Sequence, residues 1–394
     1  MSASPSIIDQ IESKVGHAAM DLYVLPTSLF AAWRVPLTSP TPNSGATNDN
    51  PLDTPAHRQC LGLEWDIRKD HAHIADMSKP LVLVVGATGY TGKAIASAIL
   101  EEGKFRLAIL VREQSIDKPV VKELVAAGAE LRVGDTSDPP EKLEEHLAGV
   151  ETLICTVLVW IADQKPLFVA AKKVGVARVV PSDFGPVAPK GAMWMNDIKI
   201  GIHEYIKELG LPYTFIYDGW WLTFMWPTPH SEKNTLATPK FYAGSKDQKV
   251  IYSTFPTIGK LVARIIADPR TINQTVVAHD GEITLGETWA IGEKVTGEDF
   301  SDYYKASEAD LDAASAQSIN WMKKSTADYY RSLYIRGDNT IAKAEAAGAL
   351  IARNLYPDVP YPDVLEEAKT RYATSFVPEY GVPLEELLDV YKPE

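Results

Sequence analysis

Cysteine and basic residues are both scarce in this 394-residue chain. Cys60 and Cys155 are the only two cysteines. They form neither a metal-binding pair nor a disulfide framework, and such scarcity is typical of proteins in a reducing compartment. The chain has 39 Lys and Arg against 52 Asp and Glu, a net charge of -13. No global basic field is therefore available to hold a polyanion, and we expect no nucleic-acid partner.

Long apolar runs are absent as well. No stretch reaches the roughly 20 apolar residues that a bilayer-spanning helix needs. The first twenty residues contain acidic side chains and lack both a basic start and an unbroken apolar segment, so they do not look like a secretory signal. We therefore expect a cytoplasmic protein with no membrane partner, and the residues single out no metal site.

The pattern of segments changes near residue 79. Residues 1–78 sustain no amphipathic period and include a Pro-, Ser-, Thr- and Asn-rich stretch, which predicts a poorly structured N-terminal extension. Residues 79–225 alternate β-branched runs with helical segments, which predicts a nucleotide-binding domain with a doubly wound parallel sheet of Rossmann type. Residues 226–394 lose this alternation and are expected to form mainly a second, smaller α/β substrate domain. Whether part of residues 250–285 returns to the first sheet is left open.

A glycine-rich turn follows the first strand of the predicted sheet. Its glycines are spaced G-x-x-G-x-x-G, and the turn opens a helix. The first glycine allows a tight turn, the second lets the backbone approach a pyrophosphate, and the third lets the helix pack closely on the sheet. Free N–H groups and the positive helix end bind phosphates in such turns. We therefore assign cofactor binding to Gly86, Ala87, Thr88, Gly89, Tyr90, Thr91 and Gly92.

The end of the second strand indicates which nucleotide is used. Enzymes that use NAD place an acid there to accept from the ribose hydroxyl, whereas this chain has Arg112. An arginine fork can bind a 2′-phosphate in a bidentate manner, and Lys118 adds a second positive charge. Glu113, an acidic residue next to Arg112, would instead favour NAD. The balance favours NADPH.

Lys199 is the candidate chemical residue. A helix is predicted from about Asp197 to Leu209, with Asn196 or Asp197 as its cap, and Lys199 and His203 lie one turn apart beside its apolar stripe. A lysine near a helix start that is also buried has a lowered pKa and can act as a base. The alternative is a lysine whose ammonium simply reaches water.

Tyr242 and Lys246 form a competing candidate pair, because they match the Tyr-x-x-x-Lys spacing of short-chain dehydrogenases. That chemistry needs both side chains on one helix. Here Gly244 and Ser245 lie between strand-like runs, which predicts the tip of a hairpin over residues 240–253. We do not expect this tyrosine and lysine to cooperate.

Several short stretches, in this order, resemble the isoflavone reductase-like group of the NmrA-like atypical short-chain dehydrogenases, which includes phenylcoumaran benzylic ether and pinoresinol-lariciresinol reductases. The resemblance covers about residues 80–385 and rests on GATGYTG, the strand end at Arg112, GD, PSDFG, Lys199 followed by GLPYTF, DPRTINQTV, YIRGDNT and LYPDVPY. It implies that Lys199 is the general base and that the glycine turn with Arg112 and Lys118 binds NADPH. We also assign Thr156, Phe184 and His203 to the cofactor side. The family commonly has an arginine where this chain has His203, which leaves cofactor contacts and substrate choice open.

The resemblance implies an NADPH-dependent reductase of a small aromatic, phenylpropanoid- or polyketide-like substrate, with a homodimer as an open question. Lys199 would take a phenol proton, and the charge delocalised into the ring would make a benzylic carbon or conjugated bond ready to accept hydride. Trp220, Trp221 and Phe224 could wall a flat substrate pocket, or could be core aromatics at a domain junction. A non-enzymatic NADP(H)-sensing regulator of the NmrA type and a redox-neutral isomerase or dehydratase are the alternatives.

Overall fold

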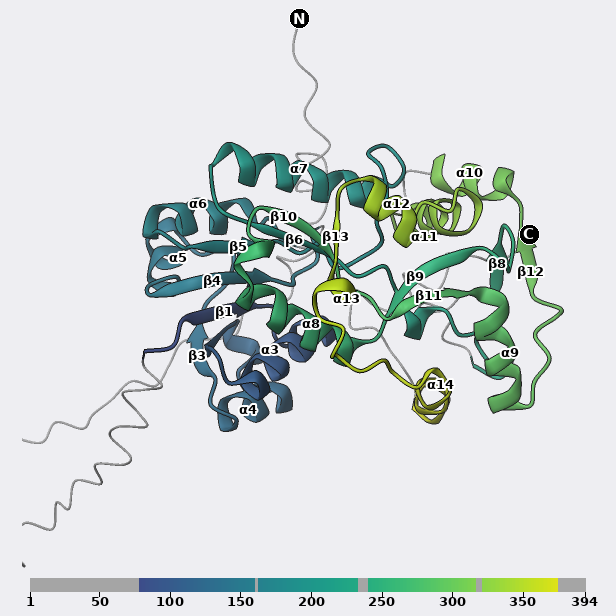
Figure 1. Cartoon of the computed structure of the whole chain (residues 1–394), viewed down its shortest axis with the longest axis horizontal. Coiled ribbons are helices and arrows are strands. Elements are labelled where there is room, and N and C mark those ends of the chain that lie inside the picture. The colour runs from purple at the N-terminus through teal and green to yellow at the C-terminus, as the bar shows by residue number, and fades with distance from the viewer. Residues whose placement is uncertain (1–77, 160–161, 233–239, 317–320, 375–394) are drawn as a thin grey trace, which may run out of the picture. The chain divides into compact units, whose positions relative to one another are not determined.

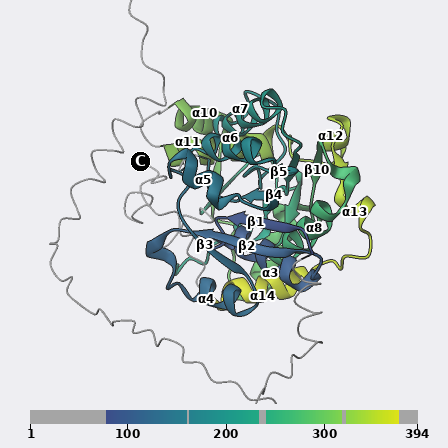
Figure 2. The ribbon, with the colours of Figure 1, turned by 90° about the vertical axis from the view of Figure 1, so that its left-hand side faces the viewer.

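The computed structural model describes residues 78–159, 162–232, 240–316 and 321–374. The extension expected over residues 1–78 thus falls, but for its last residue, outside the described residues. The centre of the fold is a parallel five-stranded sheet in the order β3-β2-β1-β4-β5 (Figure 2). Its strands are β1 (Leu81–Val85), β2 (Arg106–Val111), β3 (Glu130–Val133), β4 (Val150–Cys155) and β5 (Arg178–Val180).

Helices cover both faces of this sheet, as the sequence predicted (Figure 1). Val82 and Val84 pack with one set of helices, whereas Leu81, Leu83 and Val85 pack with the other. Successive residues of a strand point to opposite faces, so an all-apolar strand such as β1 needs cover on both sides. The first set is α3 (Tyr90–Glu102), α4 (Pro119–Ala126) and α8 (Phe255–Ala267), and the second is α5 (Pro140–His146), α6 (Lys165–Val174) and α7 (Trp194–Glu208).

Three further parallel strands continue beside β5. A bridge between Val179 and Tyr213 links β5 to the start of β6 (Thr214–Tyr217). Strand β6 pairs with β10 (Gln274–Val277), which pairs with β13 (Leu350–Ile351). Helix α8 packs tightly on α3, since a Cβ on Gly259 would lie 2.3 Å from the carbonyl oxygen of Ala94. Residues 255–277 therefore return to the nucleotide-side sheet after the chain has left it.

The second, smaller α/β part contains two small sheets. One has the order β11-β9-β7 and the other pairs β12 with β8. Around them lie helices from the last third of the chain. The strands are β7 (Trp220–Trp221), β8 (Phe241–Ala243), β9 (Lys249–Ser253), β11 (Gly281–Thr284) and β12 (Tyr304–Ala306). The helices are α9 (Leu285–Thr296), α10 (Glu308–Ala316), α11 (Trp321–Tyr330) with a π-helical turn (Arg331–Ile335), and α14 (Val364–Ala373). Two short helices, α12 (Ile341–Ala346) and α13 (Ala352–Leu355), instead pack beside β13. Short 3-10 turns cover Glu113–Ser115, Leu222–Phe224 and Pro269–Thr271.

The predicted hairpin over residues 240–253 is wrong. Strand β8 pairs in parallel with β12, while β9 pairs with β11 and β7 in a different sheet. Between them Gly244, with φ +64°, runs so close to Tyr334 that a Cβ would lie 2.1 Å from its carbonyl oxygen. This tertiary contact draws the two strands apart, so they find other partners.

Local signals mark the ends of two helices near these sheets. The Ala-rich stretch near Ala344 forms only the short helix α12, which Thr340 caps and after which Gly348 adopts φ +84°. Helix α9 begins with a capping box between Thr284 and Glu287. Among the described residues, no helix combines the length and the apolar character that crossing a membrane requires.

Candidate functional site

The glycine turn lies between the end of β1 and the start of α3. Gly86 has φ +91°, and the backbone N–H of Gly89 donates to its carbonyl oxygen at 3.1 Å. A Cβ on Gly92 would lie 2.2 Å from that same oxygen, so only glycine lets α3 approach so closely. Around Gly89, by contrast, a Cβ would meet nothing nearer than 3.6 Å. A side chain would therefore clash at Gly92, whereas Gly89 at the helix start has room for one, and Gly86 adopts a backbone conformation that favours glycine.

Thr156 locks the turn to the neighbouring strand β4. Its hydroxyl donates to the carbonyl oxygen of Val85 at 2.9 Å, and its backbone N–H donates to the same oxygen at 2.9 Å. A Cβ on Gly86 would come within 2.6 Å of the Thr156 hydroxyl. The structure therefore brings Thr156 directly against the predicted phosphate-binding turn.

Arg112 and Lys118 follow β2 at the same edge of the sheet. Arg112 precedes a 3-10 turn, and its side chain is 59% exposed, with Nε 4.0 Å from the Asp135 carboxylate beyond β3. Such an exposed pair is weak, so the guanidinium remains able to bind another anion. Lys118 lies at the N-terminal boundary of α4. Both cations stand where the ribose end of a dinucleotide lies in Rossmann folds.

Helix α7 begins at Trp194, three residues earlier than predicted, and neither Asn196 nor Asp197 caps it. The Asn196 amide donates to the carbonyl oxygen of Ala188 at 2.8 Å, and the Asp197 carboxylate accepts from Gly191 N–H at 2.7 Å. Both side chains hold the preceding loop rather than the helix end. Lys199 therefore lies in the second turn of α7, where the helix dipole contributes less and burial contributes more.

The Lys199 side chain is buried, with 8% of its surface exposed. Its Nζ donates to the carbonyl oxygen of Asp183, and it lies 3.0 Å from where a Cβ of Gly185 would be. Burial lowers the pKa of Lys199 below its ordinary value of 10.5, and the carboxylates of Asp183 and Asp218 oppose that shift. The amine does not reach out to water, and burial favours its neutral, basic form.

His203 lies one helical turn further along α7 and shares a partner with Lys199. Its Nε2 lies 2.7 Å from Oδ1 of Asp183, and its ring stacks on Phe215 at 3.7 Å. Asp183 thus holds Lys199 through its backbone and His203 through its side chain. In this structure His203 orients the segment that carries the Lys199 partner. Phe184, the next residue, is half-buried against the core on the α3 side.

Sequence reasoning missed Asp183 and Asp218 as site residues. Asp218 follows β6, and its N–H and that of Gly219 both donate to the carbonyl oxygen of Gly185 at 3.1 Å. Its carboxyl is fully buried, and burial raises its pKa well above the ordinary value. The signal was available, since Asp218 directly follows β6 and Asp183 comes three residues after β5, and parallel strands end at one edge of a sheet.

The predicted aromatic wall divides into two groups. Trp220 lies 4.9 Å from Tyr329 and 5.6 Å from Phe224, measured between ring centroids. The Tyr329 hydroxyl in turn lies 4.0 Å from where a Cβ of Gly185 would be, which places this group beside Lys199. Tyr329 was not predicted from sequence.

Trp221 turns the other way from Trp220. It stacks on Phe255 at 4.3 Å, and Phe255 stacks on Tyr90 of the glycine turn at 5.4 Å. With 9% of its surface exposed, Trp221 packs in the core on the α3 and α8 side. This stack connects the nucleotide turn with the segment that carries Asp218 and Trp220.

Tyr242 and Lys246 make a contact unlike that of a catalytic pair. The Lys246 Nζ lies 4.6 Å from the centre of the Tyr242 ring and 3.8 Å from that of Trp289. The ammonium therefore contacts the ring faces in a cation–π arrangement. This pair belongs to the core of the smaller part, where Tyr242 and Trp289 pack.

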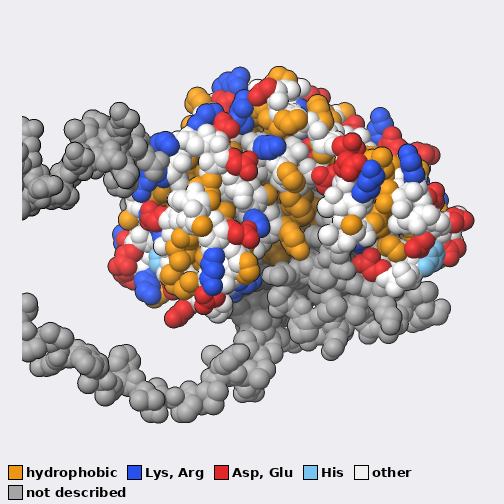
Figure 3. Space-filling model, turned by 90° about the horizontal axis from the view of Figure 1, so that it is seen from below, with side chains coloured by type: hydrophobic (Ala, Val, Ile, Leu, Met, Phe, Trp, Pro, Cys, Tyr) orange, Lys and Arg blue, Asp and Glu red, His pale blue; other side chains and the backbone are white. Residues whose placement is uncertain are grey.

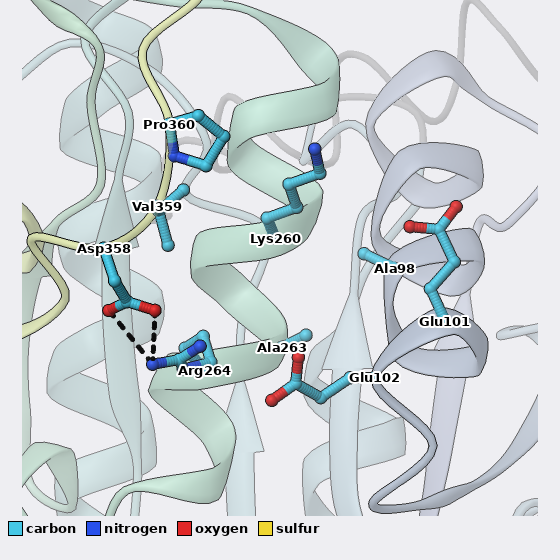
Figure 4. A pocket seen from close by; sticks show the side chains of 9 residues that line it. All are labelled: Ala98, Glu101, Glu102, Lys260, Ala263, Arg264, Asp358, Val359 and Pro360. Atoms are coloured by element: carbon cyan, nitrogen blue, oxygen red, sulfur yellow. Dashed lines mark hydrogen bonds and ion pairs between the residues drawn. The ribbon is translucent and has the colours of Figure 1, made fainter.

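A separate pocket of about 330 Å³ lies between the C-terminal half of α3, helix α8 and residues 358–360 (Figure 4). Glu101, Glu102 and Lys260 line it, together with the Arg264–Asp358 ion pair. Its walls begin at Ala98, more than two helical turns from Gly89, so it is distinct from the site at the glycine turn. Charged side chains of both signs line it together with apolar residues, and none of the lining residues is aromatic.

The described part of the face seen from below shows no continuous field of one charge. Seen from below, acidic and basic side chains alternate with apolar ones across the molecule (Figure 3). Within residues 78–374 as far as they are described, no three His, Cys, Asp or Glu side chains are grouped so that they could hold a metal ion.

Comparisons with known proteins show which sequences and folds this chain is similar to. Residues 78–367 match the sequence model of the NmrA-like family. The chain is 30% identical to asnovolin J 5′,6′-dehydrogenase of Aspergillus novofumigatus, over 73% of this chain and 94% of that protein. It is 29% identical to eugenol synthase 1 of Petunia hybrida, over 74% and 98%.

Solved structures give the same fold. The leucoanthocyanidin reductase–NADPH complex from Vitis vinifera superposes with a TM-score of 0.65 at 23% identity, over 75% of this chain and all of that one. AtPrR2 with NADP+ and (+)pinoresinol superposes with a TM-score of 0.60 at 25% identity, over 74% and 99%. The matched region in each case is about three quarters of this chain and nearly the whole of the other protein.

Proposed function

The chain belongs to the NmrA-like family, and we propose that it is an NADPH-dependent reductase of small aromatic substrates in which Lys199 is the general base. The family resemblance and the Rossmann-type α/β fold expected from the sequence are thereby confirmed. One observation carries the catalytic part of the proposal: the Lys199 amine is 8% exposed at the same sheet edge as the glycine turn.

The residues at the glycine turn suit a dinucleotide. Gly86 and Gly92 can only be glycine, because a Cβ at either would meet Thr156 or the turn backbone below 3 Å. Gly89 instead leaves room beside the first turn of α3, where no side chain caps the helix. Backbone N–H groups and the positive helix end can therefore hold a pyrophosphate, and Arg112 with Lys118 can hold a 2′-phosphate. NADPH bound in this way supplies hydride.

The chain's own groups prepare the substrate. A neutral Lys199 amine can take the proton of a phenol, while the carbonyl oxygen of Asp183 fixes one N–H of that amine. His203 fixes Asp183 in turn. Trp220 and Tyr329 offer flat faces beside the amine, which suits an aromatic ring. The phenolate then spreads its charge into the ring, and the benzylic or conjugated carbon becomes able to accept hydride.

The named relatives support the substrate class and leave the direction open. One is named for eugenol and another was solved with pinoresinol, and both of these compounds are phenols. A third is named as a dehydrogenase, so the reverse reaction with NADP+ belongs in any assay. The names of two of these relatives, a synthase and a dehydrogenase, describe enzymes, which favours an enzyme over the non-enzymatic regulator.

The test is NADPH oxidation with a panel of phenolic ethers, enones and ketones, using the wild type and Lys199→Met. We expect Lys199→Met to bind NADPH normally and to lose about 100-fold or more in kcat, the usual contribution of a general base. The matched control is Lys190→Met, which removes an exposed lysine that pairs with Glu204 just outside the site. O-methylation of the substrate phenol should abolish turnover by the wild type. Normal turnover by Lys199→Met would refute the assignment.

The proposal also assigns the parts of the chain to the nucleotide and the substrate, and includes the location and the oligomeric state. Residues 79–225, with α8 and β10, bind the nucleotide, and the rest of residues 226–394 supply the substrate side. We also propose a cytoplasmic location, and light scattering of the purified chain tests for a homodimer.

A further inference from the structure

Among the described residues, four of the eight buried side-chain polar atoms that lack a hydrogen-bond partner belong to one place in the fold. The atoms are Oδ2 of Asp183, both carboxyl oxygens of Asp218 and Nε1 of Trp220, each buried with no hydrogen-bond partner. They belong to two segments that Gly185 joins, because its carbonyl oxygen accepts from Asp218 and Gly219. Buried polar groups without partners are rare in folded proteins, and a cluster of them indicates a ligand that supplies the missing bonds.

Asp218 differs from Asp280, another buried carboxyl near this sheet edge. Asp280, which follows β10, is bound by Arg353 at 2.6 Å and by the hydroxyl of Thr254 at 2.9 Å. Neither oxygen of Asp218 has such a partner. An ionised carboxylate without hydrogen bonds is strongly disfavoured in a protein interior, whereas a neutral carboxylic acid is tolerated.

The groups around Asp218 act in opposite directions. Burial, the largest effect, disfavours the ionised carboxylate and raises the pKa of Asp218, and the charge of Asp183 after β5 acts in the same direction. Lys199 on α7 and the backbone N–H of Asp218 itself favour the ionised form, and burial outweighs them. The Nε2 atom of His203 contacts the Oδ1 atom of Asp183. Burial also favours the neutral amine of Lys199, so the two neutral forms are compatible with each other. A neutral acid and a neutral base can thus face one substrate at the same pH.

We propose that Asp218 is the acid partner of Lys199: a neutral carboxylic acid that, with the indole N–H of Trp220, binds and protonates an oxygen of the substrate. This inference rests on the proposed reductase function and deepens it. It requires a substrate with a phenol for Lys199 and a second oxygen, in a benzylic ether or a conjugated carbonyl, for Asp218. An aromatic compound with a phenol alone would not be reduced.

The proton balance is as follows for a benzylic ether. Lys199 takes the phenol proton, the benzylic C–O bond breaks, and its electron pair stays on the leaving oxygen, which takes the proton of Asp218. Bound NADPH would supply the hydride that the benzylic carbon accepts, and as the ring regains its phenolate the Lys199 ammonium returns the phenol proton. Asp218 regains its proton from solvent after product release. One NADPH and one proton are consumed per turnover.

The first measurement is infrared difference spectroscopy of the full-length protein without substrate near pH 7. We expect a carbonyl band of a protonated carboxylic acid that disappears in Asp218→Asn and persists in Asp302→Asn, an exposed control. Asn keeps the shape and neutrality of a protonated Asp, so Asp218→Asn should melt at the same temperature as the wild type. A missing band, or a marked fall in melting temperature as expected when a buried ion pair is broken, would overturn the proposal.

Turnover provides the second measurement. Asp218→Asn should lower kcat about 100-fold or more, leave KM and NADPH binding nearly unchanged, and remove the alkaline limb of the kcat–pH profile. If Lys199→Met loses turnover while Asp218→Asn keeps it, Asp218 is not the acid and the reductase function stands. If the wild type oxidises NADPH with no substrate of the panel, the reductase function fails and the role of Asp218 fails with it. The infrared result separates the two failures.

Discussion

The three glycines Gly89, Gly92 and Gly201 give a sharp test of the nucleotide site, because their surroundings differ. A Cβ on Gly92 would lie 2.2 Å from the Gly86 carbonyl oxygen and 2.7 Å from the Thr156 hydroxyl. Neither can move without disturbing the turn or its link to β4. Overpacking of this kind costs about 1–3 kcal/mol, so Gly92→Ala should lose that much stability and its NADPH affinity together.

Gly89→Ala should separate these two effects. Its backbone, at φ -84° and ψ 167°, is open to alanine, and the added methyl would meet nothing nearer than 3.6 Å. Stability should therefore change by no more than about 0.5 kcal/mol. The methyl would nevertheless stand where a pyrophosphate approaches the backbone. We expect NADPH affinity to fall at least about tenfold, which corresponds to about 1.4 kcal/mol.

Gly201→Ala is the matched control. Gly201 lies inside α7, and a Cβ there would have open space. Alanine in a helix interior is favoured over glycine by about 0.5–1 kcal/mol, so this variant should be more stable and bind NADPH normally. Urea unfolding and titration calorimetry with NADPH measure both quantities. Normal NADPH affinity in Gly89→Ala would refute the phosphate-cradling role of the turn.

Three further outcomes follow from charged groups. Arg112→Ala should weaken NADPH binding at least about tenfold and leave NADH binding nearly unchanged in calorimetry, since only NADPH carries the 2′-phosphate. Burial lowers the pKa of Lys199 in the folded protein, so between that lowered pKa and about 10.5 the unfolded chain holds a proton that the folded chain has lost. The free energy of unfolding, measured in urea, should therefore rise with pH across this range and then level off. Lys199→Met should remove this rise. Arg353→Met leaves the Asp280 carboxyl buried without its 2.6 Å partner and should cost about 3–5 kcal/mol, whereas an unchanged unfolding midpoint would show that the pair contributes nothing.

Local spacing made some of the site predictable. The glycine turn and the strand and helix around it are adjacent in sequence, so the seven consecutive residues 86–92 predict the geometry of the turn. The apolar stripe of α7 likewise fixed which side of the helix packs on the sheet, and Lys199 and His203 proved buried beside Ile202 and Ile206. The start of α7 was misplaced because Asn196 and Asp197 bind the preceding loop, a contact that no local pattern reveals.

Other features depended on which strands become neighbours. Trp220 and Trp221 are adjacent, yet they pack into different clusters because successive residues of a strand face opposite ways. The partners of β8 and β9 were set by the approach of Gly244 to Tyr334, ninety residues away in sequence.

The sequence alone determined the Rossmann alternation, the nucleotide turn and the lysine-bearing helix, since each is encoded within one continuous segment. Only the tertiary structure decided that Asp183 and Asp218 meet at Lys199. Those residues come from three separate elements, and their meeting depends on sheet order and on the Gly185 contacts that join β5 to β6. The pKa of the amine follows from that burial, which no single segment contains.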